Sequence, residues 1–276
     1  MRADNPARNP PAIQFAHASA FRDGVEILKD FTLSIREGEH LCILGPNGSG
    51  KSTIVRLIEG DLHARYREPP PLQLFGEENW KLYELRKRLG VVSDRLQMRH
   101  ARGELVADIL LSAFFGSIGL PLYADISEEM LERVVETADF LGISRLLERS
   151  AATLSSGELR RVLVGRALVH EPGMLLLDEP FTSLDIAARR SFSQLLGKLA
   201  SHGKAIILVT HELAEIPAAI ERIVCIKDGR LFADGPKEEL LRSELLSELY
   251  GIALKVERRG EVYDFSVEQD SPASTG

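Results

Sequence analysis

The chain has 276 residues, of which 44% are hydrophobic and 27% charged, a composition typical of a globular protein with a sizeable core. Its net charge of −7 argues against a general nucleic-acid surface, so no specific nucleic-acid partner is expected. The longest apolar run, residues 107–122, is too short and too interrupted to cross a bilayer, and no secretory signal opens the chain, which predicts a cytoplasmic protein.

Residues 1–12 are expected to be disordered. Short apolar runs bounded by polar residues or glycine then predict strands at 41–44, 90–93, 174–177, 205–209 and 222–226. Because amphipathic stretches separate them, these runs indicate an α/β fold with a mostly parallel sheet. Asp228-Gly229 predicts a tight hairpin that joins 223–226 to an antiparallel strand at 231–233.

The two cysteines, Cys42 and Cys225, both fall in these apolar runs, so we expect them to be buried and reduced. Between residues 94 and 166 the strand pattern gives way to helical periodicity at 107–115 and 128–141, which indicates an inserted helical subdomain.

The end of the chain carries one more helix pattern. Pro236 followed by residues 237–249 predicts a closing helix, because proline fits the first helical turn. In the tail, residues 251–276, basic and apolar residues alternate. This pattern is compatible with a small strand or with a regulatory contact, and the sequence does not decide between them. The last dozen residues are expected to be disordered.

A glycine-rich sequence follows the strand predicted at 41–44 and opens a helix. Its residues Gly45, Pro46, Asn47, Gly48, Ser49, Gly50, Lys51, Ser52 and Thr53 match the pattern GxxxxGK[ST]. Glycines let the backbone wrap a phosphate chain, so that N–H groups and the helix N-terminus face the anion. Lys51 would contact the outer phosphates and Ser52 would bind Mg²⁺, which predicts ATP and Mg²⁺ as ligands.

Two adjacent carboxylates, Asp178 and Glu179, end the apolar strand predicted at 174–177. Ligands gather at the carboxyl ends of parallel strands, so both acids are placed for chemistry. We expect Asp178 to orient Mg²⁺ through its water shell and Glu179 to polarise the water that attacks the γ-phosphate. The alternative is that the acids only terminate the strand.

The segment Leu154-Ser155-Ser156-Gly157-Glu158 lies upstream of these acids. In this order, the motifs resemble the ABC (ATP-binding cassette) ATPase family over about residues 13–245. The resemblance implies a P-loop NTPase fold, with a RecA-like ATP-binding core at 13–93 and 167–250 and a helical subdomain at 94–166. It also implies an ATPase whose catalytic residues are Lys51, Glu179 and His211.

Further roles follow from the same resemblance. Ser183 to Asp185 would form the D-loop and His211 would touch the γ-phosphate, with a structural histidine as the alternative. Phe21 would stack on adenine, unless it is a core aromatic. Ser155, Ser156 and Gly157 would bind the nucleotide of a second subunit.

The signature segment also has a local physical interpretation. Ser155 and Glu158 have the spacing of a capping box, which starts a helix. The free N–H groups and the positive end of the helix dipole suit a γ-phosphate offered by another subunit. One chain carries one P-loop and one signature, so two complete sites require two chains, paired head to tail.

One position departs from the family pattern. The stretch 89–97 has Asp94 where the family usually has a glutamine, with Gln97 three residues later. Asp94 would serve as an extra Mg²⁺ ligand, or Gln97 would reach the site if the loop is displaced. The same stretch is similar to a molybdenum-associated branch of bacterial ABC ATPases.

Three functions compete at this point. The first is the energy subunit of a transporter, peripheral on the cytoplasmic membrane face, whose helical subdomain docks a separate membrane protein. The second is a soluble ATPase that remodels a protein or cofactor complex, and the third is a weakly catalytic regulatory protein. The apolar stretch 114–120 is either the docking surface for a membrane partner or the core of the insert.

Overall fold

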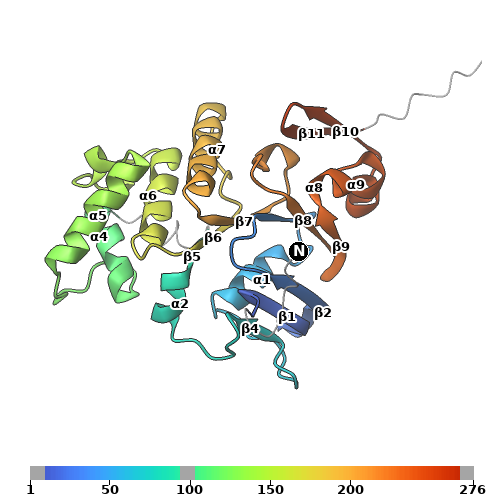
Figure 1. Cartoon of the computed structure of the whole chain (residues 1–276), viewed down its shortest axis with the longest axis horizontal. Coiled ribbons are helices and arrows are strands. Elements are labelled where there is room, and N and C mark those ends of the chain that lie inside the picture. The colour runs from blue at the N-terminus through green and yellow to red at the C-terminus, as the bar shows by residue number, and fades with distance from the viewer. Residues whose placement is uncertain (1–9, 94–102, 268–276) are drawn as a thin grey trace, which may run out of the picture.

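The computed structural model of the chain describes residues 10–93 and 103–267. A six-stranded sheet runs through its centre in the order β5-β6-β7-β3-β8-β9 (Figure 1). Its strands are β3 (Leu41–Leu44), β5 (Leu89–Val92), β6 (Met174–Asp178), β7 (Ala205–Thr210), β8 (Arg222–Lys227) and β9 (Arg230–Pro236). All neighbouring pairs are parallel except β8 with β9. This arrangement confirms the predicted mostly parallel α/β fold and its closing hairpin.

The central strands are apolar up to their last residue, which is Asp178 in β6 and Thr210 in β7, because hydrophobic clusters cover both faces of the sheet. Every residue of β3 and β7 is buried. Two hydrophobic clusters lie against the sheet: one contains Cys42, Leu175 and the helical segment, and the other contains Leu41, Leu176 and the N-terminal strands. Successive residues therefore enter opposite clusters, as the alternation of side chains along a strand requires.

A second, antiparallel sheet is built from strands that lie on both sides of β3 in the sequence. It has the order β2-β1-β4, formed by β1 (Ile13–Arg22), β2 (Val25–Ile35) and β4 (Leu72–Leu74). The sequence interpretation did not find these strands. The register of β1 against β2 shifts between Phe15 and Ala18 and twice more before Phe21, which interrupts the alternation that would reveal a strand.

The described part of the region between β5 and β6, residues 103–173, is mostly helical and lies at one end of the molecule (Figure 1). Its helices are α4 (Val106–Leu111), η1 (Ser112–Phe115), α5 (Glu128–Leu141), η2 (Ser144–Leu146), η3 (Ala151–Thr153) and α6 (Ser156–Leu168). The helix predicted at 107–115 changes to 3₁₀ geometry for its last turn, and the helix predicted at 128–141 has those bounds. The remaining helices near the sheet are α1 (Lys51–Ile58), α2 (Leu82–Arg88), α7 (Ile186–Ser201) and η4 (Leu213–Glu215).

The predicted closing helix at 237–249 is wrong as a single element. The chain forms α8 (Lys237–Leu240) and α9 (Ser243–Tyr250), separated by Leu241 at φ −84°, ψ 62° and Arg242 in an extended conformation. Leu241 is 3% exposed, so packing of its side chain into the core accompanies the break. The tail then forms a hairpin of β10 (Leu254–Arg259) and β11 (Val262–Val267).

Both cysteines are free and buried, as expected. Burial raises the pKa of the Cys225 thiol to about 12, so the group stays protonated. Within the described ranges, no helix has the length and apolarity needed to span a membrane. The predicted disorder of the terminal residues 1–9 and 268–276 falls outside the described residues.

Helix α6 lies close against the sheet at Gly90 of β5. A Cβ at Gly90 would lie 2.8 Å from the Ala167 carbonyl oxygen and 2.7 Å from Leu175 Cδ2. We expect Gly90→Ala to lower the free energy of unfolding by about 1–3 kcal/mol through overpacking, measured by urea denaturation. Gly197→Ala is the matched control: it adds a Cβ with no heavy atom within 4 Å in the middle of α7 and should stabilise by up to about 1 kcal/mol. Equal effects of the two substitutions would contradict this packing argument.

Candidate functional site

The P-loop turns between the end of β3 and the start of α1. Gly48 and Gly50 have φ values of 81° and 110°, which only glycine adopts without strain, and Gly50 is the N-cap of α1. At Gly45, a Cβ would lie 2.3 Å from the Ile226 carbonyl oxygen on the neighbouring strand. The loop therefore fits closely against the sheet, and the first N–H groups of α1 are left for an anion.

Lys51 is 4% exposed although its side chain carries a charge. Its Nζ donates to the carbonyl oxygens of Gly45 (2.8 Å) and Pro46 (3.1 Å), within the P-loop itself. Burial lowers the pKa of Lys51, and the carboxylates of Glu179 and Asp178 oppose that shift. The ammonium is thus held in place by carbonyl groups of the P-loop itself.

Glu179 and His211 approach Lys51 from the two neighbouring strands. Glu179 Oε1 lies 4.0 Å from Lys51 Nζ and 3.3 Å from His211 Nδ1. The Glu179 backbone is left-handed, at φ 45°, and its N–H donates to the Val209 carbonyl. The structure therefore brings together the three residues expected to be catalytic.

A polar network supports the loop that carries His211. Tyr250 Oη donates to the His211 carbonyl at 2.9 Å, and Arg189 Nη1 bonds Glu212 Oε2 at 2.7 Å. Glu215 accepts a hydrogen bond from the Thr210 hydroxyl, and burial raises the pKa of the Glu215 carboxyl. Sequence reasoning missed Tyr250, Arg189 and Glu215, because each acts across a turn or between distant segments and belongs to no recognisable motif.

The signature segment forms the expected capping box at the N-terminus of α6. Ser155 Oγ accepts from the Glu158 N–H at 3.2 Å, and Glu158 Oε2 accepts from the Ser155 N–H at 3.1 Å. Ser156 Oγ donates to the Ser183 carbonyl at 3.1 Å, so the signature contacts the predicted D-loop. Asp185, at the end of that loop, is the N-cap of α7.

The remaining predicted residues are placed as follows. Ser52 is exposed on the first turn of α1, and Asp178 is half-buried at the end of β6. Phe21 is 39% exposed near the end of β1, so it is not a core aromatic. Asp94 and Gln97 lie outside the described residues, and the choice between them stays a prediction.

The described residues are suited to bind a Mg²⁺-nucleotide, although they do not form a complete metal site by themselves. Among the described residues, no cluster of three or more His, Cys, Asp or Glu side chains could hold a metal ion. Mg²⁺ commonly uses one or two protein ligands plus substrate phosphates, which matches Ser52 and Asp178. The buried Ser49 hydroxyl has no hydrogen-bond partner within the described ranges, as suits a group that faces a phosphate.

Comparison with known proteins agrees with this geometry. A family described as "ABC transporter" matches residues 28–182. The chain belongs to the ABC transporter family. It is 32% identical over 251 residues to the ABC transporter ATP-binding protein YlmA of Bacillus subtilis, covering 88% of this chain and 92% of that protein. It is therefore an ATP-binding subunit that hydrolyses ATP.

Two further ABC proteins are informative. ModF of Escherichia coli is 33% identical over 81% of this chain, which spans 46% of ModF, consistent with the similarity to the molybdenum-associated branch. The post-hydrolysis dimer of the cassette MJ0796, bound to ADP and phosphate, aligns with a TM-score of 0.66 and 25% identity, covering 81% of this chain and 98% of that one. ABC ATPases of this kind dimerise.

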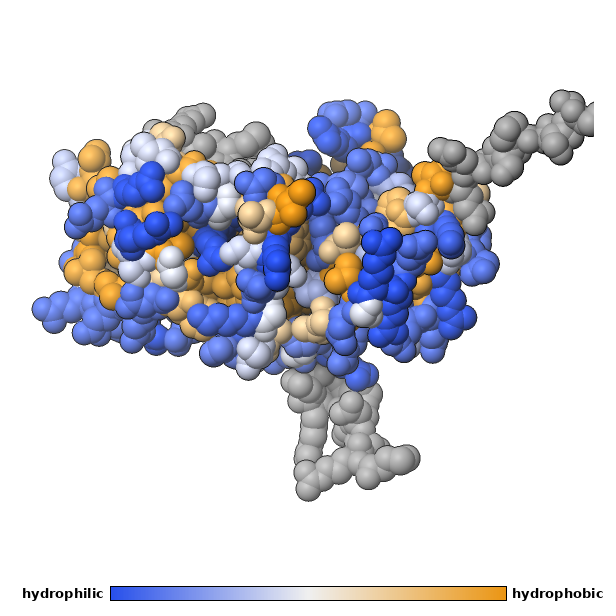
Figure 2. Space-filling model, turned by 90° about the horizontal axis from the view of Figure 1, so that it is seen from above, coloured by the Kyte–Doolittle hydropathy of each residue, from blue (hydrophilic) through white to orange (hydrophobic). Residues whose placement is uncertain are grey.

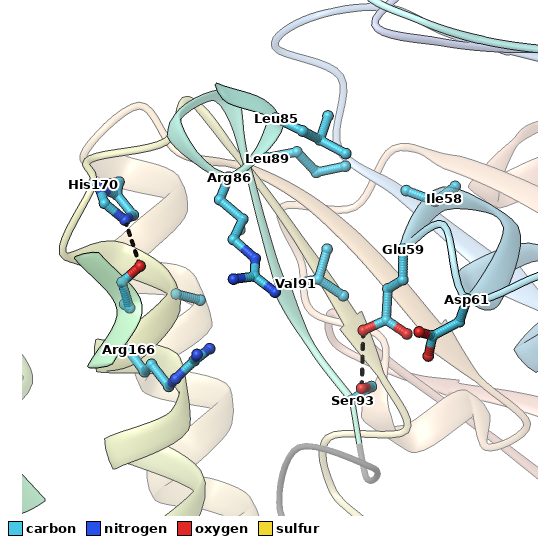
Figure 3. A pocket seen from close by; sticks show the side chains of 13 residues that line it. Ile58, Glu59, Asp61, Leu85, Arg86, Leu89, Val91, Ser93, Arg166 and His170 are labelled. Carbon is cyan, nitrogen blue, oxygen red and sulfur yellow. Dashed lines mark hydrogen bonds between the residues drawn. The ribbon is translucent and has the colours of Figure 1, made fainter. Parts of the chain in front are cut away.

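A second feature of this ABC ATPase lies where the core meets the helical segment. A cavity of about 110 Å³ opens between α1, α2, β5 and α6, and Figure 3 shows Arg86 and Arg166 reaching into it. Burial, together with the nearby charge of Arg86, lowers the pKa of Arg166 to about 10. Arg166 bonds Ser112 and Ser117, whereas Arg86 Nη1 is buried with no hydrogen-bond partner in the described part of the chain.

The capping box of the ABC signature gives a pH-dependent prediction. The hydrogen bond from the Ser155 N–H, aided by Arg149 and Arg145, lowers the pKa of Glu158. A lowered folded-state pKa stabilises the fold above the ordinary glutamate pKa, and this stabilisation is lost as pH falls through the folded-state value. Glu158→Gln keeps an oxygen that can accept from the Ser155 N–H but loses the charge, so it should be about 0.3–1 kcal/mol less stable than wild type at pH 7, with the difference shrinking in acid, measured by urea denaturation.

Glu148→Gln provides the control, because Glu148 is an exposed carboxylate in the same part of the helical segment. It should match wild type at every pH. A deficit of Glu158→Gln that persists unchanged below the glutamate range would contradict an ionic contribution to the cap.

Proposed function

We propose that the chain is the energy subunit of an ABC transporter, working as a head-to-tail dimer on the cytoplasmic face of a separate membrane protein. Residues 13–93 and 167–250 would form the ATP-binding core, and residues 94–166 the helical subdomain. The observation that carries the proposal is the meeting of Lys51, Glu179 and His211 beside the P-loop. A regulatory protein that binds ATP without hydrolysing it would not need Glu179 and His211.

Each residue has a chemical role in this proposal. The P-loop N–H groups and Lys51 hold the phosphates, while Phe21 contacts adenine with its exposed ring. Glu179 polarises the attacking water, and His211, 3.3 Å from Glu179, contacts the γ-phosphate. Mg²⁺, held by Ser52 and Asp178, would neutralise charge on the phosphates.

The signature supports the dimer. Helix α6 lies with α4 and α5 at one end of the molecule, whereas α1 lies near the centre (Figure 1). Ser155 is exposed, and Ser156 and Gly157 are half-buried, at the first turn of α6. A γ-phosphate that needs both the P-loop and a signature would therefore take the signature from a second copy.

The helical segment supports a protein partner. Hydrophobic residues reach the surface at the end of the molecule that carries α4, α5 and α6 (Figure 2). The exposed apolar residues in this segment are Leu105, Ile118, Leu122, Tyr123, Leu131 and Val135. Phe114 and Leu120 are half-buried and pack against the core cluster, whereas Ile118 is exposed, so the stretch 114–120 belongs partly to the core of the insert and partly to its surface.

We place the polar part of the docking surface at the cavity between Arg86 and Arg166. The cavity is far too small for a nucleotide but large enough for the end of one side chain. The carboxylates of Glu59 and Asp61 already line the cavity beside the two guanidinium groups. Arg86 Nη1 nevertheless has no hydrogen-bond partner among the described residues, so it would donate to a further carboxylate placed there. The proposed partner therefore presents an acidic side chain at this junction.

The catalytic roles predict the behaviour of Glu179→Gln. Turnover should fall about 100-fold or more, because the polarising carboxylate is lost, while Mg-ATP stays bound and traps a dimer. ATPase assays and size-exclusion chromatography with ATP measure both effects. Glu136→Gln, an exposed carboxylate of α5, should leave turnover unchanged.

Lys51→Ala should instead lose retention of Mg-ATP and form no dimer. A Glu179→Gln protein that stays monomeric with ATP would contradict the head-to-tail pairing. Unchanged nucleotide retention by Lys51→Ala would contradict the proposal that Lys51 holds the phosphates.

The docking surface predicts a selective defect. Arg86→Gln should keep basal ATPase activity but lose co-purification of a multi-span membrane protein from detergent-solubilised cells, because the partner's carboxylate loses its ion pair. Lys87→Gln is the control, since Lys87 is the neighbouring residue of α2 and is exposed. Recovery of only soluble proteins by the wild type would favour remodelling over transport.

A further inference from the structure

The C-terminal part of the chain holds the loop of His211 at two points. At the first, Tyr250, the last residue of α9, donates its hydroxyl hydrogen to the His211 carbonyl oxygen at 2.9 Å. At the second, Lys237 Nζ of α8 donates to the Pro217 carbonyl oxygen at 3.0 Å, and Lys237 is 8% exposed. Side chains from a different part of the chain thus fix both ends of the segment 211–217.

The C-terminal hairpin completes this support. Strand β11 packs against η4, the turn that follows His211, and the ring of Phe265 lies 5.8 Å from the ring of Tyr250. Leu254 and Tyr263 of the hairpin are buried in the same hydrophobic cluster as Leu213. The C-terminal hairpin therefore packs against the loop that carries His211.

The chemistry of Tyr250 suits a permanent donor. Burial raises the pKa of its hydroxyl, so the group remains protonated throughout the physiological range. Its acceptor is the backbone carbonyl of His211, the residue whose Nδ1 lies 3.3 Å from Glu179 Oε1. A bond to the backbone leaves the imidazole ring available for other partners while limiting where the ring can lie.

We propose that Tyr250 is a positioning residue for ATP hydrolysis: its hydroxyl anchors the His211 backbone so that the imidazole stays beside Glu179 and the γ-phosphate. This inference rests on the proposed role of His211. Displacement of a catalytic group by about 1 Å can slow the chemical step strongly with little effect on substrate binding. The C-terminal tail thereby contributes to turnover from outside the nucleotide site.

Tyr250→Phe tests the proposal because it removes only the hydroxyl and keeps the ring against Phe265. Turnover per nucleotide-binding site should fall about three- to tenfold, the range expected for losing one hydrogen bond that holds a catalytic group. KM for ATP and the number of Mg-ATP molecules bound per chain should remain at wild-type values. Steady-state ATPase assays and titration with a fluorescent ATP analogue at 25 °C measure these quantities in the full chain.

Two variants complete the experiment. Tyr66→Phe removes a hydroxyl that bonds Glu68 on the exposed surface and should behave as wild type. His211→Ala tests the underlying role: turnover equal to wild type would overturn that role and, with it, the positioning inference. Slow turnover by His211→Ala with normal turnover by Tyr250→Phe would overturn the positioning inference alone.

A structural role would give a different result. If Tyr250→Phe lowers the number of binding sites or raises KM in parallel with the loss of turnover, Tyr250 supports the general fold and the proposal is wrong. A loss confined to turnover per site supports it.

Discussion

The structure of the site depends on keeping one buried ammonium charged. Lys51 is almost fully enclosed, and burial alone would favour its neutral form. Two P-loop carbonyls and the carboxylate of Glu179 offset that penalty. Each comes from a different part of the fold, so the lysine retains its charge only when β3, the P-loop and β6 are correctly aligned.

That alignment follows from the parallel sheet. Strands β6, β7 and β3 are neighbours and run in the same direction, so Glu179, His211 and the P-loop all leave the sheet at one edge. The order of β6, β7 and β3 in the sheet differs from their order in the chain. Residues more than a hundred positions apart, such as Lys51 and Glu179, thereby meet within 4.0 Å.

Much of the core and the catalytic centre could be predicted from the sequence, because each relies on local signals. The strand at 41–44 is continuously apolar, and the P-loop after it is a contiguous motif. The antiparallel sheet could not be predicted, since bulges in β1 break its alternation. The break at Leu241 was missed for another reason: no glycine or proline marks it, and the burial of Leu241 accompanies it.

The supporting residues of the site were hidden because their partners are distant in the sequence. Tyr250 bonds a carbonyl 39 residues away, and the bond from Arg189 to Glu212 spans 23. A tyrosine ending a helix and an arginine beginning one are ordinary residues until the fold supplies those partners. Motifs therefore predicted which groups take part in the chemistry, whereas tertiary structure was needed to find what holds them.

These supports also connect the signature segment to the loop that carries His211. Ser156 Oγ bonds the Ser183 carbonyl, and Arg189 Nε bonds the Leu184 carbonyl at 3.3 Å. The same guanidinium pairs with Glu212, the residue after His211, and the hydrogen bond to Glu212 raises the pKa of Arg189. Arg189 is partly exposed, so each contact contributes at most about 1 kcal/mol.

Contacts of that size are strong enough to favour one loop geometry and weak enough to exchange during a catalytic cycle. A movement of the D-loop at Ser183 or Leu184 must be accommodated at Arg189, and Arg189 also touches the histidine loop. On its other side, that loop accepts a hydrogen bond from the half-buried Tyr250 and packs against β11. Several contacts would have to change together on that side, whereas the α7 side depends on one partly exposed guanidinium. A displaced Ser183–Asp185 loop would therefore rearrange the Arg189 side first and leave the imidazole in register with Glu179.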